Sequence, residues 1–253
     1  MLRTLILRLV HHLIAFVELI VGFLKFFPQY NILSSKKCLP AKVQADAKQL
    51  RKLPQHIGLI VVENDISYKD LANIVVWSVT MGISYISIYD VNGEIKRNNM
   101  QLQKEIEDSR REMSFDKENT ANEIWIYCHG LYTEQRAIGC GGKKAWVHLL
   151  SAEDGQQSLS LVARCLCKQV STQQTLAKDI SSDLVDKLLH DIYSFPDPDL
   201  CIKFGSCDSL LGYLPWHIRL TEILFVPSHR GLSYPAFFST MTLYSKSEQR
   251  FGK

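Results

Sequence analysis

The residues best suited to binding a phosphate group stand at the C-terminus, in the run EQRFGK that ends the chain. The guanidinium of Arg250 presents a planar fork of N–H donors to diphosphate oxygens and stays charged at any relevant pH. Gly252 has no Cβ, so its backbone N–H can approach an anion closely. Arg250 and Gly252 are therefore a candidate anion-binding pair, although a lone arginine at a chain end is more often simply solvated.

Other reactive residue types occur at spacings that do not suit chemistry. Cys165 and Cys167 would face opposite sides of a helix, which makes them a poor metal pair. Cys128 and His129 are neighbours in sequence, and such neighbours rarely point at one another as nucleophile and base. The glycine-rich string from Gly139 lacks the spacing of a P-loop. We expect these residues to serve packing and turns.

Composition excludes several classes of protein. The chain has 253 residues, a formal charge of +3 and 22% charged residues, and it has no long basic stripe with interleaved aromatics. Nucleic-acid binding is therefore not expected. The seven cysteines are an odd number and are scattered along the chain. This pattern favours a reducing compartment over a disulfide framework.

A longer signature covers residues 198–222, which read PDLCIKFGSCDSLLGYLPWHIRLTE. It resembles the late signature of cis-prenyltransferases, in which a PDLLI strand runs into R-T-S-G-E-x-R-L-S-N-F-L-x-W. The matching positions are Pro198, Asp199, Leu200, Ile202, Leu210, Leu214 and Trp216. The first diphosphate-binding arginine of that pattern is Lys203 here, the Gly-Glu pair is Ser206-Cys207, and the second arginine is Ser209. The resemblance implies a scaffold that keeps its frame and has lost most of its cationic clamp.

A second position shows the same loss. Active members of that family open with a strand similar to H-V-A-I-I-M-D-G-N, whose aspartate holds the magnesium diphosphate of the allylic substrate. Residues 56–64 here read HIGLIVVEN, so the aspartate position is Val62. Valine has no oxygen with which to coordinate a hard cation. Glu63 is one residue further on, and neighbouring side chains on a strand point to opposite faces, so we expect it to be a poor substitute. His56 and Glu222 also match family positions, and we expect them to hold the fold.

The C-terminal run completes the resemblance. Arg250-Phe251-Gly252 matches an R-x-G pattern that, in the family, reaches across a dimer interface into the active site of the other subunit. With residues 150–155 (LSAEDG) and the WHIRLTE run, it makes the chain similar to the accessory subunits of eukaryotic dehydrodolichyl diphosphate synthase, the Nogo-B receptor family. The similarity covers His56 to Lys253. It implies no catalytic residue in this chain alone.

The resemblance implies a division of roles between two chains. A catalytic cis-prenyltransferase subunit would bind Mg²⁺ and elongate farnesyl diphosphate with isopentenyl diphosphate, giving the polyprenyl diphosphate used for dolichol and protein glycosylation. Arg250 and Gly252 would bind isopentenyl diphosphate in that subunit's site, and Lys203 would at most make a weak contact. Two alternatives stay open. The chain could be a receptor or scaffold with an inactive fold, or a self-sufficient synthase that uses Glu63 and Lys203 in relocated roles.

An α/β architecture would position these residues. Short apolar runs alternate with amphipathic stretches, which is typical of a mostly parallel central sheet flanked by helices, and the resemblance narrows this to the cis-prenyltransferase fold. The predicted strands are 57–62, 85–89, 145–150, 200–203 and 222–226, and the predicted helices are 68–81, 95–113, 158–169, 181–191 and 234–249. Residues 114–142 fit no regular element, so we expect a long loop or insertion there.

The N-terminal segment, Leu2 to Phe27, is apolar enough to enter a bilayer and also carries charged residues. It could span the membrane once, lie in the membrane plane, or be a buried soluble helix. The lysines and arginines that follow it favour a cytosolic C-terminal domain if it spans. We expect a membrane anchor over residues 1–28, a basic linker over 29–53 and one domain over 54–253. The resemblance places the anchor in the endoplasmic reticulum membrane.

Overall fold

The computed structural model describes residues 40–113, 122–128, 134–138 and 143–248, which all belong to one compact unit. The predicted membrane segment and the two candidate anion-binding residues, Arg250 and Gly252, lie outside these residues. Within the described ranges, no helix has both the length and the apolar character needed to cross a membrane.

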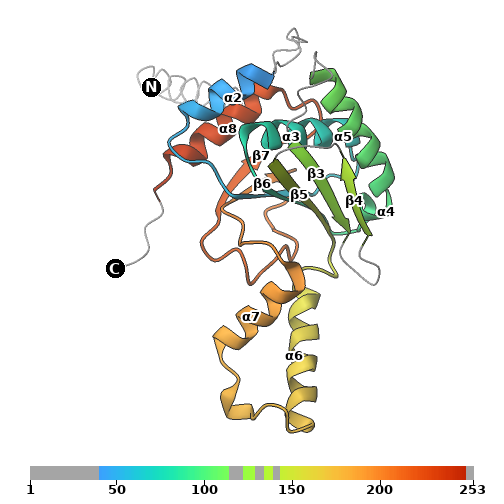
Figure 1. The fold of residues 1–253 in the computed structure, drawn as a ribbon, viewed down its shortest axis with the longest axis vertical. Coiled ribbons are helices and arrows are strands. Elements are labelled where there is room, and N and C mark those ends of the chain that lie inside the picture. The colour runs from blue at the N-terminus through green and yellow to red at the C-terminus, as the bar shows by residue number, and fades with distance from the viewer. Residues whose placement is uncertain (1–39, 114–121, 129–133, 139–142, 249–253) are drawn as a thin grey trace, which may run out of the picture. The chain divides into compact units, whose positions relative to one another are not determined.

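A single seven-stranded sheet forms the centre of this unit, in the order β4-β3-β5-β2-β1-β6-β7 (Figure 1). The strands are β1 (His56–Val61), β2 (Tyr85–Asp90), β3 (Asn122–Cys128), β4 (Glu134–Ile138), β5 (Lys143–Leu150), β6 (Leu200–Phe204) and β7 (Glu222–Val226). Six of them run parallel, and only β4 is antiparallel to its neighbour β3. The predicted strands are confirmed as β1, β2, β5, β6 and β7.

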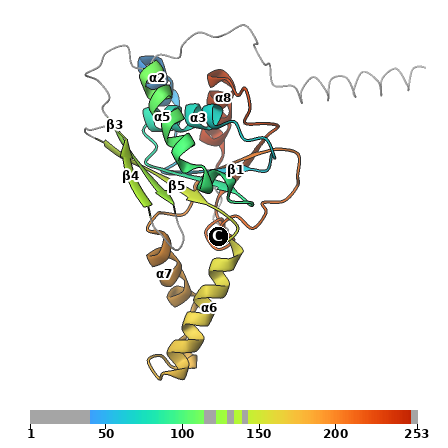
Figure 2. The same ribbon diagram turned by 90° about the vertical axis from the view of Figure 1, so that its right-hand side faces the viewer.

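The helices lie on both sides of the sheet, as parallel strands require. They are α2 (Pro40–Gln49), α3 (Tyr68–Met81), α4 (Glu94–Arg97), α5 (Asn99–Met113), α6 (Gln156–Ser171), α7 (Ser182–Tyr193) and α8 (Tyr234–Lys246), with a short 3-10 turn at Ala177–Asp179. Figures 1 and 2 show α2, α3, α5 and α8 over one face, while α6 and α7 extend away from the other. The prediction of a helical α/β architecture is thus confirmed.

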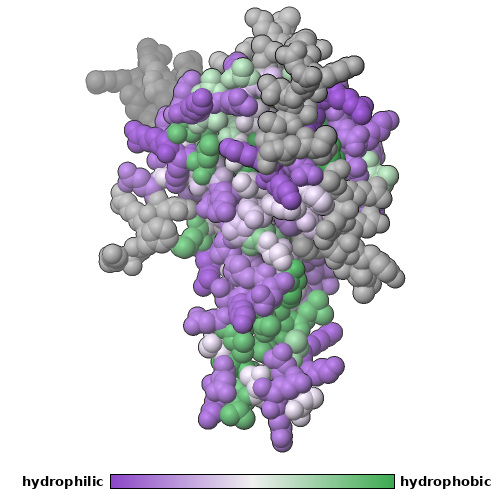
Figure 3. Space-filling view, viewed as in Figure 1, coloured by the Kyte–Doolittle hydropathy of each residue, from purple (hydrophilic) through white to green (hydrophobic). Residues whose placement is uncertain are grey.

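The two faces of the sheet carry different side chains. The face under α3 and α8 is aliphatic, with Ile57, Leu59 and Val61 of β1 all buried in the larger core. The opposite face carries polar and aromatic groups. On this face His56 of β1 lies beside Tyr85 of β2, and Gly58 of β1 lies beside Ser87. A smaller core under α6 and α7 covers the middle of this second face. The α6–α7 pair and its connection leave much apolar surface open (Figure 3), with Leu161 of α6, Ile192 of α7, and Leu176 and Ile180 between them exposed.

The prediction of one long loop over 114–142 is wrong for two of its segments. Residues 122–128 form β3, which lies between β5 and β4 and pairs with both. The period-two pattern explains this, since Ile124 and Ile126 are buried in the main core while Trp125 and Trp146 of β5 meet on the other face. β4 follows as a hairpin partner of β3. The predicted helix over 95–113 is also divided, at Asn98, whose amide donates to the Tyr68 hydroxyl over 2.9 Å.

The predicted linker over 29–53 is wrong for residues 40–49, which form α2. Val43 and Ala47 of this helix are buried in the main core, four residues apart on one face. After the helix, the Arg51 N–H donates to the Ser245 hydroxyl of α8 over 3.0 Å. Lys42 and Lys48 are therefore on the solvent side of a packed helix, and the folded unit begins before residue 54.

Candidate functional site

The carboxyl ends of β1, β6 and β7 form the candidate site. Ligands of open parallel sheets bind at this edge, where the connecting loops leave the strands. The three strand ends are joined by backbone hydrogen bonds: Val62 N–H donates to Phe204 C=O over 3.1 Å, and Gly205 N–H donates to Val226 C=O over 3.2 Å. The segment at the family's aspartate position and the segment of the late signature therefore lie side by side.

Val62 occupies the aspartate position as a packing residue. It is partly buried against the smaller core. Gly205 has a φ of +107°, a left-handed conformation that favours glycine, and a Cβ there would lie 3.3 Å from the Val62 Cβ. The backbone at Gly205 therefore packs against the apolar Val62 side chain. Active cis-prenyltransferases, which this chain resembles, have a carboxylate at that position.

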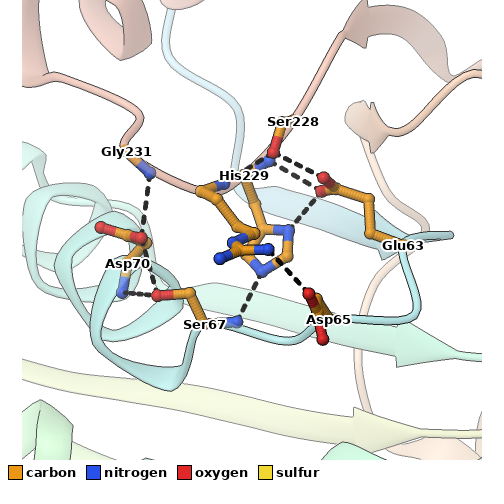
Figure 4. A network of polar contacts seen from close by, with 8 residues as sticks. Glu63, Asp65, Ser67, Asp70, Ser228, His229 and Gly231 are labelled. Carbon is orange, nitrogen blue, oxygen red and sulfur yellow. Dashed lines mark hydrogen bonds and ion pairs between the residues drawn. The ribbon is translucent and has the colours of Figure 1, made fainter.

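Glu63 is engaged by the loop that follows β7. Its Oε1 accepts from the Ser228 hydroxyl over 2.5 Å, and its Oε2 accepts from the His229 N–H over 2.9 Å and from the His229 ring (Figure 4). Burial would raise the pKa of this carboxyl, but the hydrogen bonds from Ser228 and His229 outweigh burial and lower it. Glu63 is thus an ionised, fully bonded structural carboxylate, and the alternative that gives it a catalytic role is not supported.

Lys203 does not present its ammonium to the site. The side chain is only 1% exposed, and Nζ lies 5.0 Å from the ring centroid of Phe225, its register partner on β7. A cation over an aromatic face is stabilised by the ring quadrupole. In this geometry the Lys203 ammonium is buried beside Phe225, so it is not positioned for the weak phosphate contact that the sequence suggested.

The loop after β6 lacks the side chains that the family pattern would use to bind diphosphate. Ser206 and Ser209 are exposed and Cys207 is half-buried. The loop is anchored from within the sheet, because the buried Tyr213 hydroxyl bonds the Ser87 hydroxyl over 2.7 Å. The Tyr89 hydroxyl likewise donates to the Leu211 carbonyl over 2.6 Å. Ser206, Cys207 and Ser209 carry no positive charge, so these positions cannot clamp a diphosphate.

Neither Val62 nor Glu63 is suited to hold a magnesium ion. Mg²⁺ requires oxygen ligands in octahedral geometry, whereas Val62 has no oxygen and both Glu63 oxygens already accept hydrogen bonds. In the part of the chain that the structure describes, no group of three His, Cys, Asp or Glu side chains could hold a metal ion.

Two residues of the edge, Ser228 and His229, carry no motif that the sequence analysis could use. Their only signal is a polar run directly after a strand, at the position where parallel sheets build their sites. The structure also forms a pocket of about 620 Å³ beside them, lined by Asp65, Ile66, Ser67, Asp70, Arg230 and Gly231. α8 ends at Lys246, and the N–H of the next residue, Ser247, donates to the Tyr244 carbonyl. Arg250 and Gly252 come shortly after this helix in the sequence.

Comparison with known proteins defines the class. No family model matches the chain. The fold is similar to that of lavandulyl diphosphate synthase from Lavandula x intermedia, with a TM-score of 0.55, 16% identity and coverage of 79% of this chain and 98% of that one. A tritrans,polycis-undecaprenyl-diphosphate synthase of Methanocaldococcus jannaschii is 22% identical over 270 residues. The fold is that of a cis-prenyltransferase.

More similar relatives define the family. The mouse dehydrodolichyl diphosphate synthase complex subunit Nus1 is 42% identical over 212 residues, which cover 83% of this chain and 69% of the mouse protein. The human subunit NUS1 is 40% identical over 222 residues, covering 83% and 70%. The chain belongs to the NUS1 family of dehydrodolichyl diphosphate synthase complex subunits. The resemblance to the accessory subunits is confirmed.

Proposed function

We propose that this chain is the non-catalytic subunit of a heteromeric cis-prenyltransferase. Its partner would condense isopentenyl diphosphate onto farnesyl diphosphate and make the polyprenyl diphosphate required for dolichol synthesis and protein glycosylation. One observation carries the proposal: the sheet edge keeps the backbone frame of a prenyltransferase, while Val62 and the bonded Glu63 replace its metal-binding carboxylate. A chain built in this way would depend on a second subunit for turnover.

The partner would hold both the allylic substrate and Mg²⁺. This follows from the oxygen ligands that magnesium requires, which this edge does not offer. The open apolar surface of α6 and α7 supports the proposal that this chain functions in a complex, because exposed apolar patches mark interaction sites. When bound in the partner, the ion would neutralise diphosphate charge.

The C-terminal tail would complete the partner's isopentenyl diphosphate site. Arg250 would offer two parallel N–H donors to phosphate oxygens, and the Gly252 N–H would approach the same anion. Each charge-assisted hydrogen bond is worth about 1.5–3 kcal/mol, which corresponds to roughly ten- to a hundredfold in rate or affinity. The tail would therefore hold and orient the diphosphate without taking part in bond making.

The N-terminal segment would anchor the complex in the endoplasmic reticulum membrane, with the folded unit in the cytosol. Its apolar run and the lysine-rich stretch that follows support this arrangement. Whether the segment spans or lies in the membrane plane does not alter the role proposed for the tail.

Reconstitution tests the proposal. Incorporation of labelled isopentenyl diphosphate into long-chain product is measured with the full chain alone, with a catalytic cis-prenyltransferase subunit alone, and with both together in Mg²⁺. We expect turnover only from the mixture. Full turnover by the catalytic subunit alone would instead support the receptor or scaffold role.

A further inference from the structure

The connection from β7 to α8 is fastened to the connection from β1 to α3. Figure 4 shows Ser228, His229 and Gly231 of the first loop meeting Glu63 and Ser67 of the second and Asp70 in the first turn of α3. Asp70 accepts from the Ser67 hydroxyl over 2.7 Å and from the Gly231 N–H over 2.9 Å. Together with the bonds to Glu63, these contacts fix the loop immediately before α8.

His229 is the centre of this connection, and its two ring nitrogens have opposite roles. The Ser67 N–H donates to Nε2 over 2.9 Å, so Nε2 carries no proton. Nδ1 must then carry the ring proton, and it donates to the Glu63 carboxylate. His229 is completely buried. Because water cannot replace either partner, each bond depends on the neutral tautomer in this one orientation.

The loop controls the start of the helix that leads to the tail. α8 begins at Tyr234, five residues after His229, and is 13 residues long. At about 1.5 Å per residue the helix is a rod of roughly 20 Å, so a displacement at its first turn carries through to its last. The tail with Arg250 and Gly252 follows that last turn.

We propose that His229 is a positioning residue for the C-terminal tail. The inference rests on the proposed function, since it concerns where the tail would meet the partner's substrate. His229 touches no substrate itself. It holds α8 in register with the sheet, and a misplacement of about 1 Å at a reacting centre can cost a hundredfold in rate.

The packing of α8 separates positioning from folding. Phe237 and Met241 are fully buried in the main core, and the Trp77 ring of α3 lies 5.8 Å from that of Phe237. These apolar contacts do not involve the polar connection. Variants at His229 should therefore fold and join the complex while holding α8 less tightly.

Two substitutions test the ring nitrogens one at a time. His229→Asn keeps a donor near the Nδ1 position for Glu63, and His229→Gln keeps an acceptor near the Nε2 position for Ser67. We expect each to raise the KM for isopentenyl diphosphate about tenfold in the complex, as a small displacement of the tail would. Ser228→Ala removes the bond to Glu63 and the bond from the Arg230 N–H but leaves the His229 ring in place, so it serves as the milder variant should a ring substitution fail to fold. Lys69→Gln is the control, because its ion pair with Glu112 is solvent-exposed and takes no part in the connection between the two loops, so it should leave KM unchanged.

A double-mutant cycle with Arg250→Ala decides the question. If His229 acts through the tail, His229→Gln causes a clearly smaller loss in an Arg250→Ala complex than in the unsubstituted complex, because only the Gly252 contact is then left to displace. Losses that multiply would overturn the inference, as would a wild-type KM in both His229 variants. If Arg250→Ala itself leaves the rate unchanged, the proposed role of the tail fails as well. Thermal unfolding and co-purification with the partner are measured for every variant, so that loss of the complex is not mistaken for a change in KM.

Discussion

The Tyr234 hydroxyl donates to the Asp46 carboxylate over 2.8 Å and joins α8 to α2 across 188 residues of sequence. Lys42 and Lys52 extend the same contact, with their ammonium groups 5.8 Å and 4.5 Å from the rings of Tyr234 and Tyr244. The helix that leads to the tail is therefore supported along its length by a segment that precedes β1.

Removing α2 should destabilise the folded unit. A fragment of residues 54–253 loses the buried Val43 side chain and the Asp46 bond, whereas residues 40–253 retain both. Burial of one such aliphatic side chain is worth about 1.5–3 kcal/mol, so we expect the shorter fragment to unfold at a clearly lower urea concentration. Equal midpoints for the two fragments would show that α2 adds no stability.

Stability should fall between pH 6.5 and pH 4. Burial lowers the pKa of His56 to about 4, although its hydrogen bond to the Pro196 carbonyl opposes the shift, and burial next to His190 lowers the pKa of His217 to about 4. The unfolded chain binds more protons than the folded chain in this window, so stability is complete above pH 6.5 and is lost as pH falls. By pH 4, the protonation of each histidine should lower the free energy of unfolding by about 3 kcal/mol.

Denaturant titrations at pH 7.5, 6 and 5 measure this dependence. His217→Phe keeps a ring beside Tyr193 and Phe195 but cannot take up a proton. We expect this variant to lose about half of the pH dependence. A wild-type chain whose stability is flat from pH 7.5 to 5 would contradict the assignment of neutral buried histidines.

Restoring the aspartate should not restore activity. Val62→Asp places a carboxylate under Gly205, but Glu63 remains bonded to Ser228, and Lys203 and Ser209 still stand at the two arginine positions of the family pattern. We expect the full chain with this substitution to show no prenyl transfer in the absence of a partner, and to lose stability because a half-buried valine becomes charged. Magnesium-dependent turnover by this variant alone would revive the self-sufficient synthase.

Sequence reasoning predicted most of the fold because the strands bury one continuous aliphatic face. It assigned α3 correctly, since the Ser67 cap and Gly82 mark both ends. It missed β3 because the Trp125 and Tyr127 side chains alternate with Ile124 and Ile126 in a short run with polar neighbours. It missed α2 because charge dominates that helix, and only Val43 and Ala47 show its buried face.

The candidate site was predictable only in part. The loss of charge at Val62, Cys207 and Ser209 can be read from the sequence, because it depends on residue identity within a known frame. The contact of Glu63 with His229 cannot, since it joins residues that are 166 positions apart and belongs to no motif. The burial of Lys203 beneath Phe225 likewise depends on strand order, which places β7 beside β6.

The most direct test of the shared active site is the effect of Arg250→Ala on prenyl transfer by the intact complex. We expect kcat/KM for isopentenyl diphosphate to fall roughly ten- to a hundredfold, because a charge-assisted contact is lost, while thermal stability and partner binding are unchanged. Arg250→Lys should recover only part of the loss, since an ammonium cannot reproduce the planar fork. A complex with Arg250→Ala that runs at the full rate would contradict the account.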